Sequence, residues 1–178
     1  MIAGPRRTNF STTIETHPSD STAQGMVERA ILERLGEEHP EWRPIEWRLA
    51  AAELGLSSVW QKAKPDAVWR NGPDELIVAE CYARVGSLKP GHRRKLAMDA
   101  LKLLALSHHC PAAKRLRCVI IVPEELRKQL ERDGWFCVAL RMAAEIMPIA
   151  LSDVERKLLT DATERQADGQ ARARNRKT

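Results

Sequence analysis

An apolar segment from Leu76 to Ala83 contains a single charged residue, Glu80, and follows the turn sequence Asn-Gly-Pro-Asp at 71–74. A shorter apolar segment, from Asp66 to Trp69, precedes the turn. Two such segments around a turn are typical of an antiparallel hairpin. Because antiparallel pairing brings the start of the first strand beside the end of the second, Asp66 and Glu80 are expected to be neighbours. The chain is therefore expected to fold around a sheet with two acids close together at one end.

Helical and strand-like patterns alternate along the rest of the chain. In residues 41–60 a strand from Trp42 to Leu49 and a helical turn over 50–54 are expected. In the last helix, Ser152 and Glu155 have the spacing of a capping box. This alternation predicts an α/β fold with a mixed central sheet flanked by helices. Beyond the hairpin the predicted elements are a helix around 27–35, a helix over 92–106, a strand over 118–122, a helix that begins at Pro123 and ends at Gly134, a strand over 135–140 and a helix over 152–166.

The composition is typical of one globular domain, since 43% of the 178 residues are hydrophobic and 30% are charged. Residues 1–22 are predicted to be a flexible leader, residues 23–160 a single domain and residues 161–178 a polar basic tail. No apolar run reaches the ~18 residues that a membrane helix needs. No signal-peptide pattern is present either, so we expect a cytoplasmic protein without membrane contact.

The four cysteines predict neither a disulfide framework nor a zinc site. None forms a CxxC pair, and Cys81, Cys118 and Cys137 lie in apolar, strand-like segments where a free thiol behaves as a small hydrophobe. The sequence His108-His109-Cys110 is interpreted as a helix end, because adjacent residues rarely converge on one ion. We therefore expect reduced cysteines.

The charge of the chain is unevenly distributed. The formal net charge is +5, and the segment from Arg84 to Arg117 holds nine Lys or Arg and one acid, Asp99. The segment from Glu28 to Glu53 instead holds seven acids and four bases. A basic middle segment fits a surface that attracts phosphates, and it equally fits a solvated run of charge.

Asp66 and Glu80 have the chemistry of a magnesium site. Two carboxylates on neighbouring strands can share a hard cation, which polarises a phosphate and lowers the pKa of a bound water. Glu80 also interrupts an apolar strand, where an unpaired buried charge would cost several kcal/mol. The alternative is a strand-end acid that reaches water or pairs with an arginine such as Arg84.

Pro65-Asp66, followed fourteen residues later by Glu80 inside a hydrophobic strand, resembles the PD-(D/E)xK pattern of the restriction-endonuclease-like nucleases. The resemblance covers roughly residues 24–140. It implies a core of a helix, a three-strand meander, a crossover helix and another strand. It also implies a metal-dependent endonuclease that cuts DNA with Mg²⁺, for which Mn²⁺ can substitute. A homodimer, or a subunit of a larger complex, and a role in restriction or phage defence fit the family in general.

The chain departs from this pattern at the position of the motif lysine, which Tyr82 occupies. The following helix offers replacements, because His92, Lys95, Asp99 and Lys102 form one narrow polar stripe on a helix expected to be largely buried. The stripe faces either solvent or a polar cavity. We expect Lys95 to orient the attacking water, with Lys102 and Lys89 as the next candidates.

The resemblance also implies an acid on the first helix as a further metal ligand. Glu28 is preferred over Glu33, and each also fits an ordinary surface acid. Aromatic side chains next to arginines suggest base stacking, chiefly for Trp42 or Trp60, although core packing is the commoner role of Trp. The residues expected to contact the nucleic acid are Lys89, His92, Arg93, Arg94 and Lys102.

A second interpretation keeps the nuclease fold without catalysis. With Tyr82 at the lysine position, the domain would bind DNA or a protein partner as an inactive subunit. An enzyme of unrelated chemistry is the third interpretation. It is weakened because the sequence has no GxxxxGK, GxSxG or HExxH motif.

Overall fold

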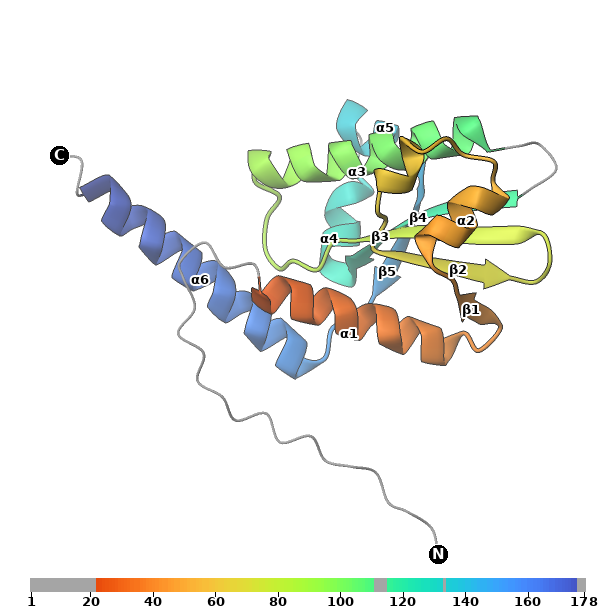
Figure 1. Ribbon diagram of the computed structural model, residues 1–178. Coiled ribbons are helices and arrows are strands. Elements are labelled where there is room, and N and C mark those ends of the chain that lie inside the picture. Colours follow the sequence, from red (N-terminus) through yellow and green to blue (C-terminus); the bar gives the residue numbers. More distant parts are fainter. Residues whose placement is uncertain (1–21, 111–114, 133, 176–178) are drawn as a thin grey trace, which may run out of the picture.

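The computed structural model describes residues 22–110, 115–132 and 134–175. Five strands form one mixed sheet in the order β1-β2-β3-β4-β5 (Figure 1). The first three strands are antiparallel neighbours, and β3, β4 and β5 run parallel. The strands are β1 (Trp42–Pro44), β2 (Ala67–Asn71), β3 (Glu75–Cys81), β4 (Arg115–Pro123) and β5 (Glu145–Ile149).

Helices cover both faces of this sheet, as Figure 1 shows. One face packs against α1 and the start of α6, and the other packs against the remaining helices. The α/β class with a mixed central sheet flanked by helices is therefore confirmed. The helices are α1 (Thr22–Glu38), α2 (Trp47–Glu53), α3 (Pro90–His109), α4 (Glu124–Leu130), α5 (Trp135–Ala143) and α6 (Asp153–Asn175), with a short 3₁₀ turn, η1 (Trp60–Lys62).

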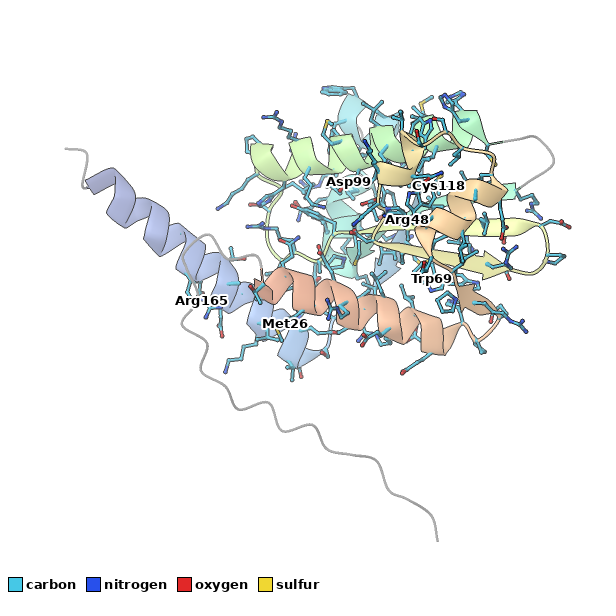
Figure 2. The ribbon with its side chains drawn as sticks, in the orientation of Figure 1. Met26, Arg48, Trp69, Asp99, Cys118 and Arg165 are labelled. Carbon is cyan, nitrogen blue, oxygen red and sulfur yellow. The ribbon has the colours of Figure 1, made fainter. Side chains whose placement is uncertain are left out.

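The alternation of side chains along β3 assigns each residue to one face. Leu76 and Val78 pack with the core under α3, whereas Ile77 and Ala79 pack with the core over α1. Cys118 of β4 belongs to the core under α3, and Trp69 of β2 belongs to the core over α1; both residues are labelled in Figure 2. Glu80 follows the parity of Leu76 and Val78, so its side chain points toward α3.

The predicted hairpin is confirmed, with Val68 opposite Val78 and Trp69 opposite Ile77. The predicted helix over 92–106 and the predicted strand over 118–122 are also present, within α3 and β4. The segment His108-His109-Cys110 is the end of α3, as expected, with Cys110 as its C-cap.

The strand predicted over 135–140 is wrong, because these residues form α5. Most residues of this helix are apolar, so its sequence fits the alternating pattern of a strand as well as the spacing of a helix. Gly134 is the N-cap of α5 and does not end α4, which ends at Leu130. Cys137 consequently lies in a helix. The last strand is β5, whose Pro148 suits an edge strand because proline donates no ladder hydrogen bond.

The strand expected from Trp42 to Leu49 is correct only for its first three residues, which form β1. From Trp47 onward the chain is helical. Trp47, Ala50, Ala51 and Leu54 are buried at helical spacing, and burial of this face explains why the segment becomes α2.

The ends of the predicted domain lie in helices. The structure begins with α1 at Thr22, and residues 1–21 of the expected leader lie outside the described residues. Position 161, where a tail was expected, lies inside α6, and residues 176–178 lie outside the described residues. The capping box is confirmed: the Glu155 backbone N–H donates to Ser152 Oγ over 3.3 Å, and the Ser152 N–H donates to Glu155 Oε2 over 2.7 Å.

Candidate active site

Asp66 lies immediately before β2, and Glu80 lies near the end of the adjacent strand β3. The Asp66 backbone N–H donates to the carbonyl of Ala79 over 3.1 Å, and Asp66 Oδ2 accepts a bond from the Cys81 backbone N–H over 2.8 Å. Asp66 precedes Val68 by two residues, and Val68 packs with the core under α3. The two acids therefore share the face of the sheet that α3 covers.

Glu80 is almost fully buried, with a relative exposure of 3%. Burial raises the pKa of its carboxyl to about 7, and the nearby charge of Asp66 adds to the rise, whereas Lys102 opposes it. Lys102 Nζ forms an ion pair with Glu80 Oε1. Apart from this ion pair, Glu80 Oε1 has no hydrogen-bond partner among the described residues. Among the described residues, Oε1 of Glu80 therefore depends on Lys102 to offset the cost of its burial.

Glu28 of α1 reaches the same end of β3. Its Oε1 accepts a bond from the Ala83 backbone N–H over 3.2 Å and another from Gln24 Nε2 over 2.8 Å. Burial raises the pKa of Glu28, and the charge of Asp66 also raises it, whereas Lys95 lowers it. These couplings bring Glu28 into the same electrostatic cluster as Asp66. Glu33, the other acid considered on this helix, is exposed.

Lys95 of α3 belongs to this cluster. Its Nζ lies 3.0 Å from Asp99 Oδ2 and 5.3 Å from the centre of the Tyr82 ring. Burial lowers the pKa of Lys95, but Asp99 and the acids Glu28 and Asp66 outweigh burial and leave the pKa raised. The ammonium is therefore held charged over Tyr82, the residue at the position of the motif lysine.

Lys102 lies two helical turns further along α3. Besides the ion pair with Glu80, its Nζ donates to the carbonyl of Lys64 over 3.3 Å. Sequence reasoning placed Lys102 among the residues that contact nucleic acid and behind Lys95 as a candidate for the motif lysine. The structure brings Lys102, and not Lys95, into direct contact with Glu80.

The polar stripe of α3 faces the end of the sheet, where Asp99 contacts Lys95 and Lys102 contacts Glu80 (Asp99 is labelled in Figure 2). The expectation that the rest of this helix is buried is wrong. Only the face of Leu96, Ala100, Leu103 and Leu106 is buried, whereas Met98 and Leu101 are 60% and 58% exposed. Since the sheet covers one side of α3, the opposite side remains in contact with solvent.

A pocket of about 370 Å³ opens between the start of α1, the end of β3 and the start of α3. His92 lies at its rim, with Nδ1 accepting the Lys89 backbone N–H over 3.2 Å. Burial lowers the pKa of His92, and the charges of Arg84 and Lys89 lower it further, so the imidazole is neutral at pH 7. The pocket is lined by Gln24, Gly25, Glu28, Tyr82, Arg84, Gly91, His92 and Lys95.

The other residues expected to contact nucleic acid surround the start of α3. Lys89 is the N-cap of the helix, and Arg93 and Arg94 are exposed in its first turns. Sequence reasoning missed Gln24, which orients Glu28. Its signal was present, because Gln24 and Glu28 have the i,i+4 spacing at which helical side chains meet.

The three acids of this site, Asp66, Glu80 and Glu28, offer carboxylate oxygens, and such donors suit Mg²⁺ better than softer metals. Glu80 Oε1 adds a buried oxygen whose one partner among the described residues is the Lys102 ammonium. The donor chemistry therefore fits a hard divalent cation. In the described part of the chain, no group of three or more His, Cys, Asp or Glu side chains is already arranged to hold a metal ion.

No protein-family model, no curated protein and no solved structure matches this chain. Within the described ranges, none of the helices has both the length and the hydropathy of a membrane-spanning segment.

Proposed function

We propose that this chain is a metal-dependent nuclease that hydrolyses phosphodiester bonds of DNA in the cytoplasm. Asp66, Glu80 and Glu28 would hold Mg²⁺ or Mn²⁺, and Lys95 would act beside them. The observation that carries the proposal is the buried carboxylate of Glu80, next to Asp66 and with Lys102 as its one ion-pair partner in the described part of the chain. A charge in such a position is costly, and a cost of this kind is typical of functional sites.

The surrounding residues have roles that suit this reaction. A bound divalent cation would polarise the phosphate and lower the pKa of a water molecule. Lys95, held charged by Asp99, would hydrogen-bond the phosphate and stabilise its developing negative charge. Arg93, Arg94 and Lys89 at the start of α3 would contact the phosphate backbone and position the strand without reading its sequence.

The order of elements adds support. Apart from α2 and η1, which lie between β1 and β2, the succession α1, β1, β2, β3, α3 and β4 corresponds to the helix, meander, crossover helix and strand implied by the PD-(D/E)xK resemblance. A homodimer or a larger complex, and a role in restriction or phage defence, would follow from the same resemblance.

One observation favours a second function. Lys102 already neutralises Glu80, and Tyr82 stands where the motif has lysine, so the fold is also compatible with a subunit that binds DNA without cutting it. The two functions differ in a single respect, which is whether DNA is cleaved when a divalent cation is added.

The test is a cleavage assay on plasmid, linear duplex and single-stranded DNA with Mg²⁺, Mn²⁺ or EDTA. Asp66→Asn removes the charge but keeps an oxygen that can accept the Cys81 N–H, and Asp74→Asn, in the exposed β2–β3 turn, is the matched control. We expect cutting by the wild type and by Asp74→Asn, and none by Asp66→Asn or with EDTA. Cutting by Asp66→Asn at the wild-type rate would rule out the proposed site. DNA binding by the wild type without any cutting would favour the inactive subunit.

A further inference from the structure

The outward face of α5 is apolar and uncovered in the described chain. Trp135 is 84% exposed and Met142 is 80% exposed, with Val138 between them at 42%. A helix that is apolar on all sides is normally buried, so this face suits an occupant from outside the domain. Trp135 is the unusual member, because a tryptophan at so exposed a position is left without the packing that normally stabilises its large ring.

The surroundings of Trp135 are positively charged. Its ring makes an edge contact with Phe136, with ring centres 6.1 Å apart, and the guanidinium of Arg93 lies 5.8 Å from the centre of the Phe136 ring. Arg94 is exposed beside Arg93, and neither the first turn of α3 nor any position of α5 carries an acid. A second copy of the chain, packed on the same face, would bring like charges together. The charge therefore favours an anionic occupant that also has flat apolar groups.

We infer that Trp135 is a stacking platform for an unpaired base of a single-stranded nucleic acid, with Arg93 and Arg94 contacting its phosphates. Bases stack on exposed aromatic rings without regard to sequence, and basic side chains follow the backbone. Bases inside a duplex have no free ring face for such a contact, so the selected strand is single-stranded or locally opened.

The start of α3 relates this surface to the proposed catalytic site. Arg93, which lies over the Phe136 ring, follows His92, and His92 lines the pocket together with Lys95 and Glu28. The inference rests on the proposed function for its substrate, and it narrows that substrate to strands with unpaired bases.

The test is a binding titration in EDTA with a fluorescent single-stranded oligonucleotide and a blunt duplex of the same length. We expect Trp135→Ala to weaken single-strand binding by roughly 5- to 150-fold, the loss typical of one base–aromatic stack. Trp135→Phe, which keeps an aromatic ring, should restore most of the affinity. Val154→Ala, at a 69% exposed apolar position of α6 and away from α5, is the control and should bind like the wild type.

Equal single-strand affinity of the wild type and Trp135→Ala would overturn the inference, as would failure of the wild type to bind any strand. A fall in oligomer mass of Trp135→Ala at unchanged strand affinity would overturn it in favour of a second copy as the occupant. The binding assay contains no metal and needs no cleavage. Trp135-dependent binding by a protein that cuts nothing would thus support this inference and count against the catalytic proposal alone.

Discussion

Two acids are buried among the described residues, Glu80 and Glu155, and their surroundings shift their pKa values in opposite directions. Burial raises the pKa of both. For Glu155, the bonds from Ser152 and the ion pair with Arg34 outweigh burial and lower the pKa. Glu80 has only Lys102 to offset burial and Asp66, so its pKa rises to about 7. The fold therefore supplies Glu155 with enough partners to keep it charged. A further cation near Glu80 would offset more of the cost of burying its charge.

Glu80 should make the metal-free protein less stable as the pH rises from 5 to 8. The folded pKa of about 7 lies above the ordinary value of 4.5, so the unfolded chain releases this proton first and gains stability over that range. Glu80→Gln should remove up to about 1.4 kcal/mol per pH unit of this dependence. Urea unfolding between pH 5 and 8 measures the effect, with the exposed Glu164→Gln as control. Identical pH profiles of Glu80→Gln and the wild type would contradict this account of Glu80.

Lys95 and Lys102 should differ in their kinetic effects if the nuclease proposal holds. Lys95 stands free of Glu80 over Tyr82, so its loss should remove stabilisation of the phosphate charge and lower kcat by roughly 100- to 1,000-fold. Lys102 pairs with Glu80 and therefore competes with the metal ion for this carboxylate, so its loss should leave kcat at saturating metal close to the wild type and lower the Mg²⁺ concentration needed for half-maximal cleavage. Steady-state cleavage by Lys95→Ala and Lys102→Ala over a range of Mg²⁺ concentrations separates the two roles. Full rescue of Lys95→Ala by excess Mg²⁺ would contradict the role given to Lys95.

At the scale of the elements, the hairpin was predictable because its signals are local. The turn at 71–74 fixes the pairing of β2 with β3, and the pairing sets Asp66 beside Glu80. The helix α3 and the strand β4 were predictable for the same reason, because the narrow polar stripe of the helix and the apolar run of the strand are both local patterns. The contact of Lys102 with Glu80 was only partly predictable. The polar stripe on α3 was recognised, but the sequence left open whether it faces solvent or a polar cavity.

Other elements depend on packing that no local pattern reveals. Residues 135–143 form α5 because Leu140 and Ala143 pack on the sheet, yet the exposed apolar residues of α5 conceal this helical periodicity in the sequence. The strand β5 was missed because Pro148 breaks its pattern. The bond of Glu28 to Ala83 joins residues that are far apart in sequence, so the preference for Glu28 over Glu33 depended on its place early in the helix, beside Val27.

The buried face of α3 should hold the helix against the sheet. Leu103 is fully buried there, so Leu103→Ala should lower the free energy of unfolding by about 2–5 kcal/mol. Leu101 is 58% exposed on the same helix, and Leu101→Ala should change it by no more than about 0.5 kcal/mol. Chemical denaturation of both variants measures the contrast. Equal losses would mean that α3 packs with a different face.

At the scale of the whole molecule, α3 connects the two surfaces of interest. One side of it, at Lys95 and Lys102, meets the acids at the end of β3, and Arg93 reaches toward Phe136 of α5. The basic segment from Arg84 to Arg117 begins shortly after β3, includes α3 and ends at the start of β4. Such an arrangement concentrates positive charge around a cluster of carboxylates, which suits a site that receives a polyanion next to a cation.

The central claim is that Asp66, Glu80 and Glu28 bind one divalent cation. Titration of the full chain with Mn²⁺, followed by electron paramagnetic resonance, measures this without any need for catalysis. The account predicts one Mn²⁺ per chain in the wild type and in Asp74→Asn, and an affinity at least roughly tenfold weaker in Asp66→Asn, since even changes outside the ligand set cost that much. The same affinity and stoichiometry in Asp66→Asn and the wild type would contradict it.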